Sequence, residues 1–188
     1  MNKNFKKLYT NEILFLLGLF TYTIGQYLIF IFFNDIEKLH NQEPIDFSHW
    51  LMIIGVLLLI PQIGNFPKSK FKFIGSPSLI CGIGLIIGMC VIDFVFWSLK
   101  DPELKSQVTK HLINTPEIWT PFMSVSGKIF NLGLLISSLN YFKKSSLGVL
   151  FVFVGTLIVY LPWGWDNVLG YLLITVGFYI NFINSKKS

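Results

Sequence analysis

Arginine and alanine are both absent from this chain of 188 residues, and charged residues of all kinds make up only 13% of it. Arginine is the side chain that usually clamps phosphate or carboxylate groups with two parallel hydrogen bonds. Its absence therefore argues against a protein that recognises phosphate groups through such paired hydrogen bonds. A soluble domain carries about twice the charged fraction found here, so the low charge also argues against a soluble domain.

Short catalytic motifs are missing as well. The sequence has no nucleophile elbow, phosphate-binding loop, dinucleotide fingerprint or HExxH zinc motif. Its two cysteines, Cys81 and Cys90, fall in one apolar segment on roughly opposite faces of a helix, and we expect both to serve packing. The sequence indicates no particular cofactor, and it favours a protein that is not an enzyme.

Long apolar blocks dominate the chain, which is 53% hydrophobic with a mean hydropathy of +0.61. A block of about 18 or more apolar residues is a candidate transmembrane helix. Six blocks of roughly this length lie at residues 13–33, 50–66, 77–99, 121–142, 147–162 and 168–183. We therefore expect an all-α fold in which residues 1–188 form a single domain, a polytopic integral membrane protein built as a bundle of six transmembrane helices.

Lysine clusters occupy both termini and the connections after the second and fourth blocks, whereas the other connections are acidic or balanced. The clustered lysines are Lys3, Lys6, Lys7, Lys68, Lys70, Lys72, Lys143, Lys144, Lys186 and Lys187. By the positive-inside rule both termini face the cytoplasm, and a bacterial inner membrane is the expected location. The basic excess is thereby explained without nucleic acid. The expected partners are the lipid bilayer and a second copy or other members of a membrane complex.

Features of the outer connections agree with this orientation. All five tryptophans, Trp50, Trp97, Trp119, Trp163 and Trp165, fall at the predicted outer boundaries. Tryptophan prefers the headgroup level, so these residues predict an anchoring belt or, alternatively, an aromatic mouth over a site. The run Asp101-Pro102-Glu103 has the pattern of a helix start. It predicts a short amphipathic helix on the outer surface.

Glycine and proline predict how the spans pack. Gly84 and Gly88 form a GxxxG step, with Gly82 just before it. Small residues of this kind let membrane helices approach closely. Pro61, inside the second span, predicts a kink or a frayed inner end there.

Two formally charged residues, Asp93 and Lys128, fall well inside the predicted spans. A charge within a membrane is costly and by default suggests a functional role. Both residues lie about 9–10 Å below the predicted outer boundary, on consecutive and therefore antiparallel spans. This spacing predicts an ion pair between them. If Lys128 instead reaches toward the headgroups, Asp93 is left alone and suggests proton coupling.

Further polar side chains are predicted at the same depth. They are Gln26 and Tyr22 in the first span and Ser124 and Asn131 in the fourth. Together with the charged pair they predict a substrate- or ion-binding pocket that opens outward. The alternative is that these groups only join the helices through hydrogen bonds.

A metal site has weaker support. His49, Asp46 and His40 lie close together at the first outer connection, and side chains of these types can bind transition metals. Their spacing matches no strict ligand pattern, so ordinary solvated loop histidines are the competing interpretation.

Three functions remain open from the sequence. The first is a small transporter or channel-like protein for a small solute or ion, with its polar site in the outer half of the membrane. The second is a non-catalytic subunit or assembly factor of a membrane complex. The third is a membrane-embedded enzyme that acts on lipid or quinone.

Overall fold

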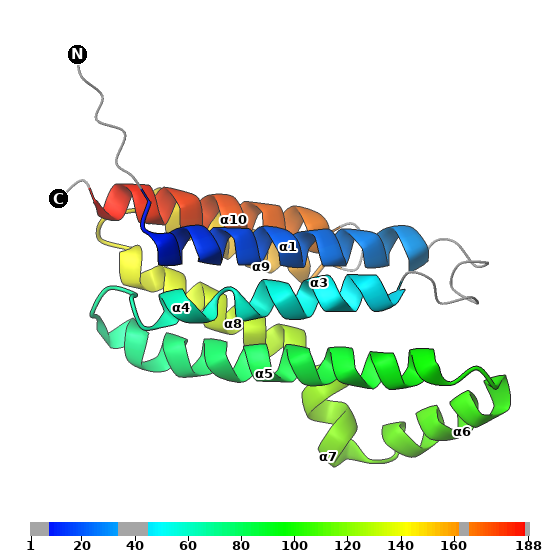
Figure 1. The fold of residues 1–188 in the computed structure, drawn as a ribbon. Coiled ribbons are helices and arrows are strands. Elements are labelled where there is room, and N and C mark those ends of the chain that lie inside the picture. The colour runs from blue at the N-terminus through cyan, green and yellow to red at the C-terminus, as the bar shows by residue number, and fades with distance from the viewer. Residues whose placement is uncertain (1–7, 34–44, 162–165, 187–188) are drawn as a thin grey trace.

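The computed structural model describes residues 8–33, 45–161 and 166–186, and within these ranges it contains helices and no β-strand. The helices are α1 (Thr10–Phe33), α3 (Ile45–Leu57), α4 (Ile60–Ile63), α5 (Lys70–Ser98), α6 (Pro102–Ile113), α7 (Pro116–Trp119), the π-helix η1 (Thr120–Ser124), α8 (Ser126–Ser138), the 3-10 helix η2 (Leu139–Tyr141), α9 (Ser146–Val159) and α10 (Asp166–Ser185). The longer helices run side by side along one axis, while α6 and α7 lie at one end (Figure 1). The predicted all-α class is confirmed.

Three helices are long and apolar enough to cross a membrane, over Thr10–Ile31, Lys70–Ser98 and Asn167–Ser185. A fourth crossing results if Pro116–Ser124 and Ser126–Tyr141, which meet at an angle of 48°, are counted as one broken span. Two shorter apolar segments, Phe47–Ile63 and Ser146–Val159, lie beside them. By length and composition the described residues therefore contain fewer spanning helices than the six predicted.

Proline explains both interruptions. Helix α3 ends at Leu57, and the short helix α4 begins again with Pro61 in its first turn. Proline has no N–H group to donate and crowds the preceding turn, so it disrupts the helix at this point. In the fourth segment Pro121 lies inside η1, and the amide of Val125 donates to the carbonyl oxygen of Thr120 at 3.1 Å. The bend follows at this point.

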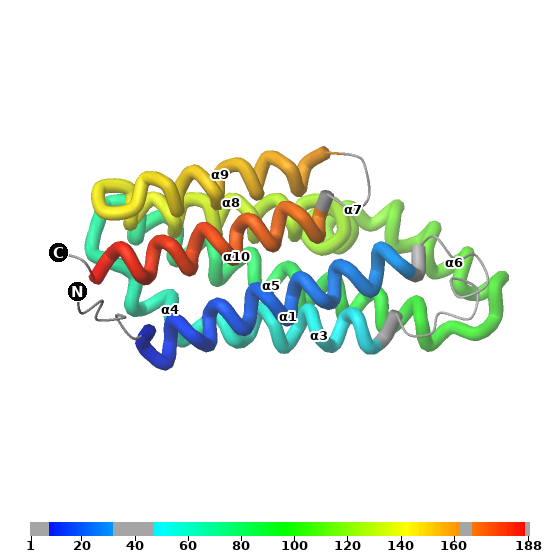
Figure 2. Tube along the Cα trace, turned by 90° about the horizontal axis from the view of Figure 1, so that it is seen from above, coloured from blue at the N-terminus to red at the C-terminus, as the bar shows by residue number. Residues whose placement is uncertain are grey.

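The ends of the bundle differ in charge. The beginning of α1, the end of α10 and the links α4–α5 and α8–α9 lie together at one end (Figures 1 and 2). The α5–α6 link lies at the opposite end. We call the first the lysine end, because the described residues Lys68, Lys70, Lys72, Lys143, Lys144 and Lys186 belong to these segments. The alternation of lysine-rich links predicted from the sequence is thus present in the fold.

Close helix packing sets the register of α5 against α8. A Cβ atom added to Gly82 would lie 2.5 Å from the Cα atom of Phe130, and one added to Gly133 would lie 2.6 Å from the Cα atom of Leu79. At Gly84 a Cβ atom would meet nothing within 4 Å. The predicted contact through the Gly84 step is therefore wrong at that residue, and Gly82 makes the close approach instead.

Helix α6 begins as predicted. The side chain of Asp101 accepts a hydrogen bond from the amide of Glu103 at 2.9 Å, and Pro102 fills the first helical position. The cap satisfies an amide that the helix itself leaves without a partner. None of the residues of α6 is buried, which agrees with a helix on the surface.

Candidate functional site

A buried polar band crosses the middle of the bundle. Tyr22 of α1, Tyr171 of α10 and Asn131 of α8 are 1%, 2% and 1% exposed. The rings of Tyr22 and Tyr171 lie 4.8 Å apart, and their side chains interact. The side chain of Tyr171 also interacts with that of Asn131, whose buried amide oxygen has no hydrogen-bond partner among the described residues. Two residues predicted for the site, Tyr22 and Asn131, are therefore joined by Tyr171, which was not predicted.

Gln26 belongs to the same band, whereas Ser124 does not. The side chain of Gln26 interacts with that of Tyr22, and its amide nitrogen lies 3.4 Å from the sulfur of Met52 on α3. Ser124 ends the π-helical turn η1, and its side chain is exposed. The polar band thus brings together three of the six predicted binding residues.

Asp93 has a partner that differs from the predicted one. Its carboxylate oxygen Oδ2 lies 3.0 Å from Nε2 of His49, and the two side chains are 26% and 6% exposed. His49 lies inside α3 and stacks edge-on against Phe94. The interpretation of His49 as a solvated loop residue is therefore wrong. In the described part of the chain Asp93 forms no ion pair with Lys128, whose side chain is exposed.

Helix register explains why the predicted pair does not form. Because Gly82 lies against Phe130, Lys128 comes level with Gly84. Asp93 is nine residues farther along α5, which corresponds to about 13 Å of helix. The prediction took Leu99 and Pro121 as points of equal depth, but the break at Val125 removes that correspondence.

The proposed metal ligands do not assemble in the described residues. His49 contacts Asp93 instead. His40 lies outside the described residues, and the structure does not describe the side chain of Asp46. Within the described part of the chain no group of three His, Cys, Asp or Glu side chains could hold a metal ion.

A cavity lies at the lysine end, away from the polar band. It encloses about 1540 Å³ and is lined by the beginning of α1, the links α4–α5 and α8–α9, and the end of α10. Its charged lining residues are Glu12, Lys68, Lys70, Lys143, Lys144 and Lys186. Five ammonium groups and one carboxylate give the cavity a strong positive charge.

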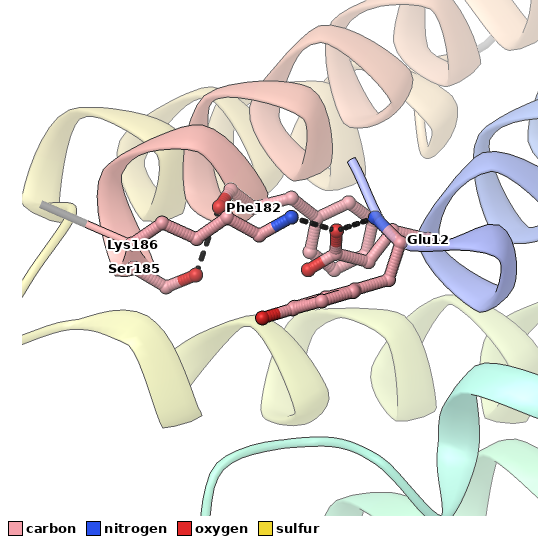
Figure 3. Close-up of polar contacts among 5 residues, drawn as sticks. Glu12, Phe182, Ser185 and Lys186 are labelled. Atoms are coloured by element: carbon pink, nitrogen blue, oxygen red, sulfur yellow. Dashed lines mark hydrogen bonds and ion pairs between the residues drawn. The ribbon is translucent and has the colours of Figure 1, made fainter. Parts of the chain in front are cut away.

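Glu12, the only carboxylate among the described residues of this lining, is already paired with a lysine. Glu12 binds the ammonium group of Lys186, and it also accepts a hydrogen bond from the backbone amide of Tyr9 at 2.8 Å (Figure 3). The ammonium group lies 4.0 Å from the centre of the Tyr9 ring. The lining also contains Lys68, Lys70, Lys143 and Lys144, which add positive charge to the cavity.

Two hydrogen-bonded links hold the lysine-bearing segments in place. The hydroxyl of Ser69 donates to the amide oxygen of Asn140 at 2.6 Å, which ties the α4–α5 link to η2. The amide of Asn184 donates to the hydroxyl of Ser145 at 3.3 Å, which ties α10 to the α8–α9 link. Lys68 and Lys143 are thus carried on segments fixed relative to each other.

An aromatic layer closes the inner wall of the cavity. Tyr141 lines the cavity beside Gln62 and is 3% exposed. Its ring lies 6.2 Å from Phe66 and 5.7 Å from Phe182, and Phe15 lies 5.7 Å from both phenylalanines. This layer separates the cavity from the polar band, because Tyr22 follows Phe15 by about two helical turns.

No clear pattern in the sequence indicated the cavity. Its lysines were fully explained by membrane orientation, and only their position on neighbouring loops shows that they surround one space. Tyr171 could have been suspected as a hydroxyl group within a buried span. No protein-family model, curated protein or solved structure matches this chain.

Proposed function

We propose that this protein crosses the membrane six times, with its lysine end in the cytoplasm, and that it transports a small anion. The shorter segments Phe47–Ile63 and Ser146–Val159 run alongside the three long apolar helices, which supports their also crossing (Figure 1). Taken together, Pro116–Ser124 and Ser126–Tyr141 are long and apolar enough for one further crossing, which supports counting them as such. With both helical ends and two lysine-rich links on one side, the positive-inside rule supports a cytoplasmic lysine end.

The observation that carries the transport proposal is the cavity at the lysine end. Five lysines line it, and Glu12, the carboxylate among its described lining residues, is neutralised by Lys186. A lysine ammonium is a compact point charge that binds an anion without the planar geometry required by arginine. A chain without arginine therefore suits a small tetrahedral or flexible anion, such as sulfate or succinate, better than a ligand recognised by a planar fork.

A passage for the anion is supported by the order of layers along the bundle. The cavity comes first, then the aromatic layer around Phe15 and Phe182, and then the polar band of Tyr22, Tyr171 and Asn131. This arrangement fits a transporter that is open at the lysine end and closed by aromatic side chains toward the other end. The polar band would then be the next binding site for the anion along the transport path.

Thermal unfolding of the purified protein tests anion binding. Unfolding is followed with sodium sulfate, sodium succinate or sodium chloride at equal ionic strength, for the wild type and for Lys68→Gln/Lys143→Gln. Sulfate raises the stability of any protein through its exclusion from the surface, and the variant measures that general effect. A binding anion adds stability of RT ln(1 + [L]/Kd), about 2.7 kcal/mol at a hundred times Kd.

We expect sulfate or succinate to stabilise the wild type beyond the double variant, whose Kd should be about tenfold higher. Lys110→Gln removes one charge from exposed helix α6, far from the cavity, and should behave like the wild type. Equal stabilisation of the wild type and the double variant by both anions would refute the proposal.

A non-catalytic subunit of a membrane complex is the second candidate. It is favoured by the close backbone packing of the helix pairs, as at Gly155, where an added Cβ atom would lie 2.6 Å from the carbonyl oxygen of Gly170. Such packing suits a rigid scaffold. Copurification of a defined membrane partner from the native host, together with a failure of both anions to bind, would support this candidate over transport.

A further inference from the structure

His49 and Asp93 form an ionisable pair between two different helices. His49 lies on α3 and Asp93 on α5, and the 3.0 Å contact joins Nε2 to Oδ2. The imidazole is 6% exposed and the carboxylate 26% exposed. The pair therefore combines a well-buried group with a partly exposed one.

The register of α1 and α3 places this pair beside the polar band. A Cβ atom added to Gly25 would lie 2.8 Å from the carbonyl oxygen of Ser48, the neighbour of His49. Gln26, which follows Gly25, reaches Tyr22 and Met52 and so belongs to the band. An anion in the band would thus lie close to the imidazole.

Few other titratable groups face the pair from the described elements that pack against α3 and α5. Cys90 lies one turn before Asp93 on α5, and Tyr22 of α1 interacts with Cys90. Lys128 of α8 is exposed and forms no ion pair with Asp93. Helices α4 and η1 contain no titratable side chain, and the titratable residue of η2, Tyr141, lies at the lysine end.

We infer that His49 and Asp93 are a proton-binding site that couples anion transport to proton movement. Histidine is the side chain that changes charge between about pH 5 and pH 8. A proton taken from water converts the imidazole to an imidazolium, which donates from Nε2 to the Asp93 carboxylate. Loss of that proton to water restores the neutral imidazole beside the carboxylate.

Coupling to a proton would lower the electrical cost of moving an anion across the membrane. An anion that crosses alone into a cell with a negative interior works against about 2.3 kcal/mol per charge for each 100 mV. A proton bound at His49 cancels one negative charge during the crossing. This inference rests on the proposed anion transport. The experiments below therefore give different results when proton binding is wrong and when anion transport is wrong.

The first experiment measures proton uptake during sulfate binding by isothermal titration calorimetry in two buffers of different ionisation enthalpy. Sulfate stays fully ionised near neutral pH, so any proton taken up is bound by the protein. We expect about one proton for each sulfate bound by the wild type near pH 7. His49→Gln and Asp93→Asn should each lower that number at least fivefold while sulfate still binds.

Matched controls replace exposed groups on α6 at the same end. His111→Gln and Asp101→Asn change the same residue types, and asparagine can keep the helix cap of α6. Both should retain the wild-type proton number. Binding of sulfate with the same proton uptake in the wild type and in His49→Gln would overturn the inference while leaving anion transport intact.

The second experiment needs no anion. The melting temperature of the ligand-free protein is followed between about pH 5 and pH 8. We expect the melting temperature of the wild type and of His111→Gln to change with pH in this range. This change should be absent from His49→Gln and Asp93→Asn. Identical pH profiles in all four proteins would overturn the inference even if sulfate proved not to bind. If Asp93→Asn does not fold, the comparison with His49→Gln decides.

Discussion

Glu12 at the beginning of α1 binds Lys186 directly after α10, so residues 174 positions apart in the sequence close the lysine end of the bundle. Both side chains are largely buried, at 8% and 13% exposure. The pair fixes the first helix to the last and at the same time neutralises the carboxylate of the cavity. Structure and electrostatics of the cavity therefore depend on the same contact.

Loss of the Glu12 carboxylate should destabilise the bundle. Glu12→Ala removes the carboxylate that binds the Lys186 ammonium and accepts from the Tyr9 amide, and we expect a loss of about 1–3 kcal/mol in unfolding free energy. Denaturant-induced unfolding in detergent micelles measures it. Adding Lys186→Met should restore part of this loss, because the uncompensated charge disappears.

Glu103→Gln on exposed α6 is the matched control and should change stability by less than about 0.5 kcal/mol. If Glu12→Ala changes stability as little as this control, the contact with Lys186 does not contribute to closing the bundle.

Two glycines on α5 should respond oppositely to the same substitution. Gly82→Ala places a methyl group 2.5 Å from the Cα atom of Phe130, so α5 and α8 must separate, with an expected loss of about 1–3 kcal/mol. Gly84→Ala meets nothing within 4 Å and should be neutral or stabilising by up to about 1 kcal/mol, because alanine favours a helix. Thermal unfolding of both variants under identical conditions makes the comparison. Equal effects would show that α5 and α8 do not meet at Gly82.

The membrane topology can be read from chemical labelling in intact cells. Lys143→Cys lies in the α8–α9 link at the lysine end, and Thr109→Cys lies on α6 at the opposite end. A membrane-impermeant maleimide added outside should label the second variant and reach the first only after the membrane is opened. Both are made in a background with Cys81→Ser and Cys90→Ser. Labelling of both from the outside would contradict the proposed crossing between them.

The sequence alone was sufficient for features that depend on local pattern. Apolar length predicted the long helices, Asp101 predicted the start of α6, and Pro61 predicted the break in the second segment. Each of these is fixed by chemistry within about one or two helical turns, through capping or a missing amide donor. The alternation of lysine-rich links also needs only the order of segments along the chain.

Contacts between helices were harder to predict, because they depend on register. Lys128 was paired with Asp93 by counting from two assumed boundaries, and the bend at Val125 made that count wrong. His49 was placed in a connection, although α3 begins at Ile45 and buries it against Asp93. A shift of nine residues along a helix changes the partner of a side chain completely.

The central claim is that the lysine-end cavity serves anion transport. The most direct test is uptake of radiolabelled sulfate and succinate, in parallel, into liposomes containing the purified protein. We predict that at least one anion enters faster than into protein-free liposomes, that Lys68→Gln/Lys143→Gln slows this uptake about tenfold, and that Lys110→Gln leaves it unchanged. Uptake of both anions at the rate of protein-free liposomes would contradict the claim.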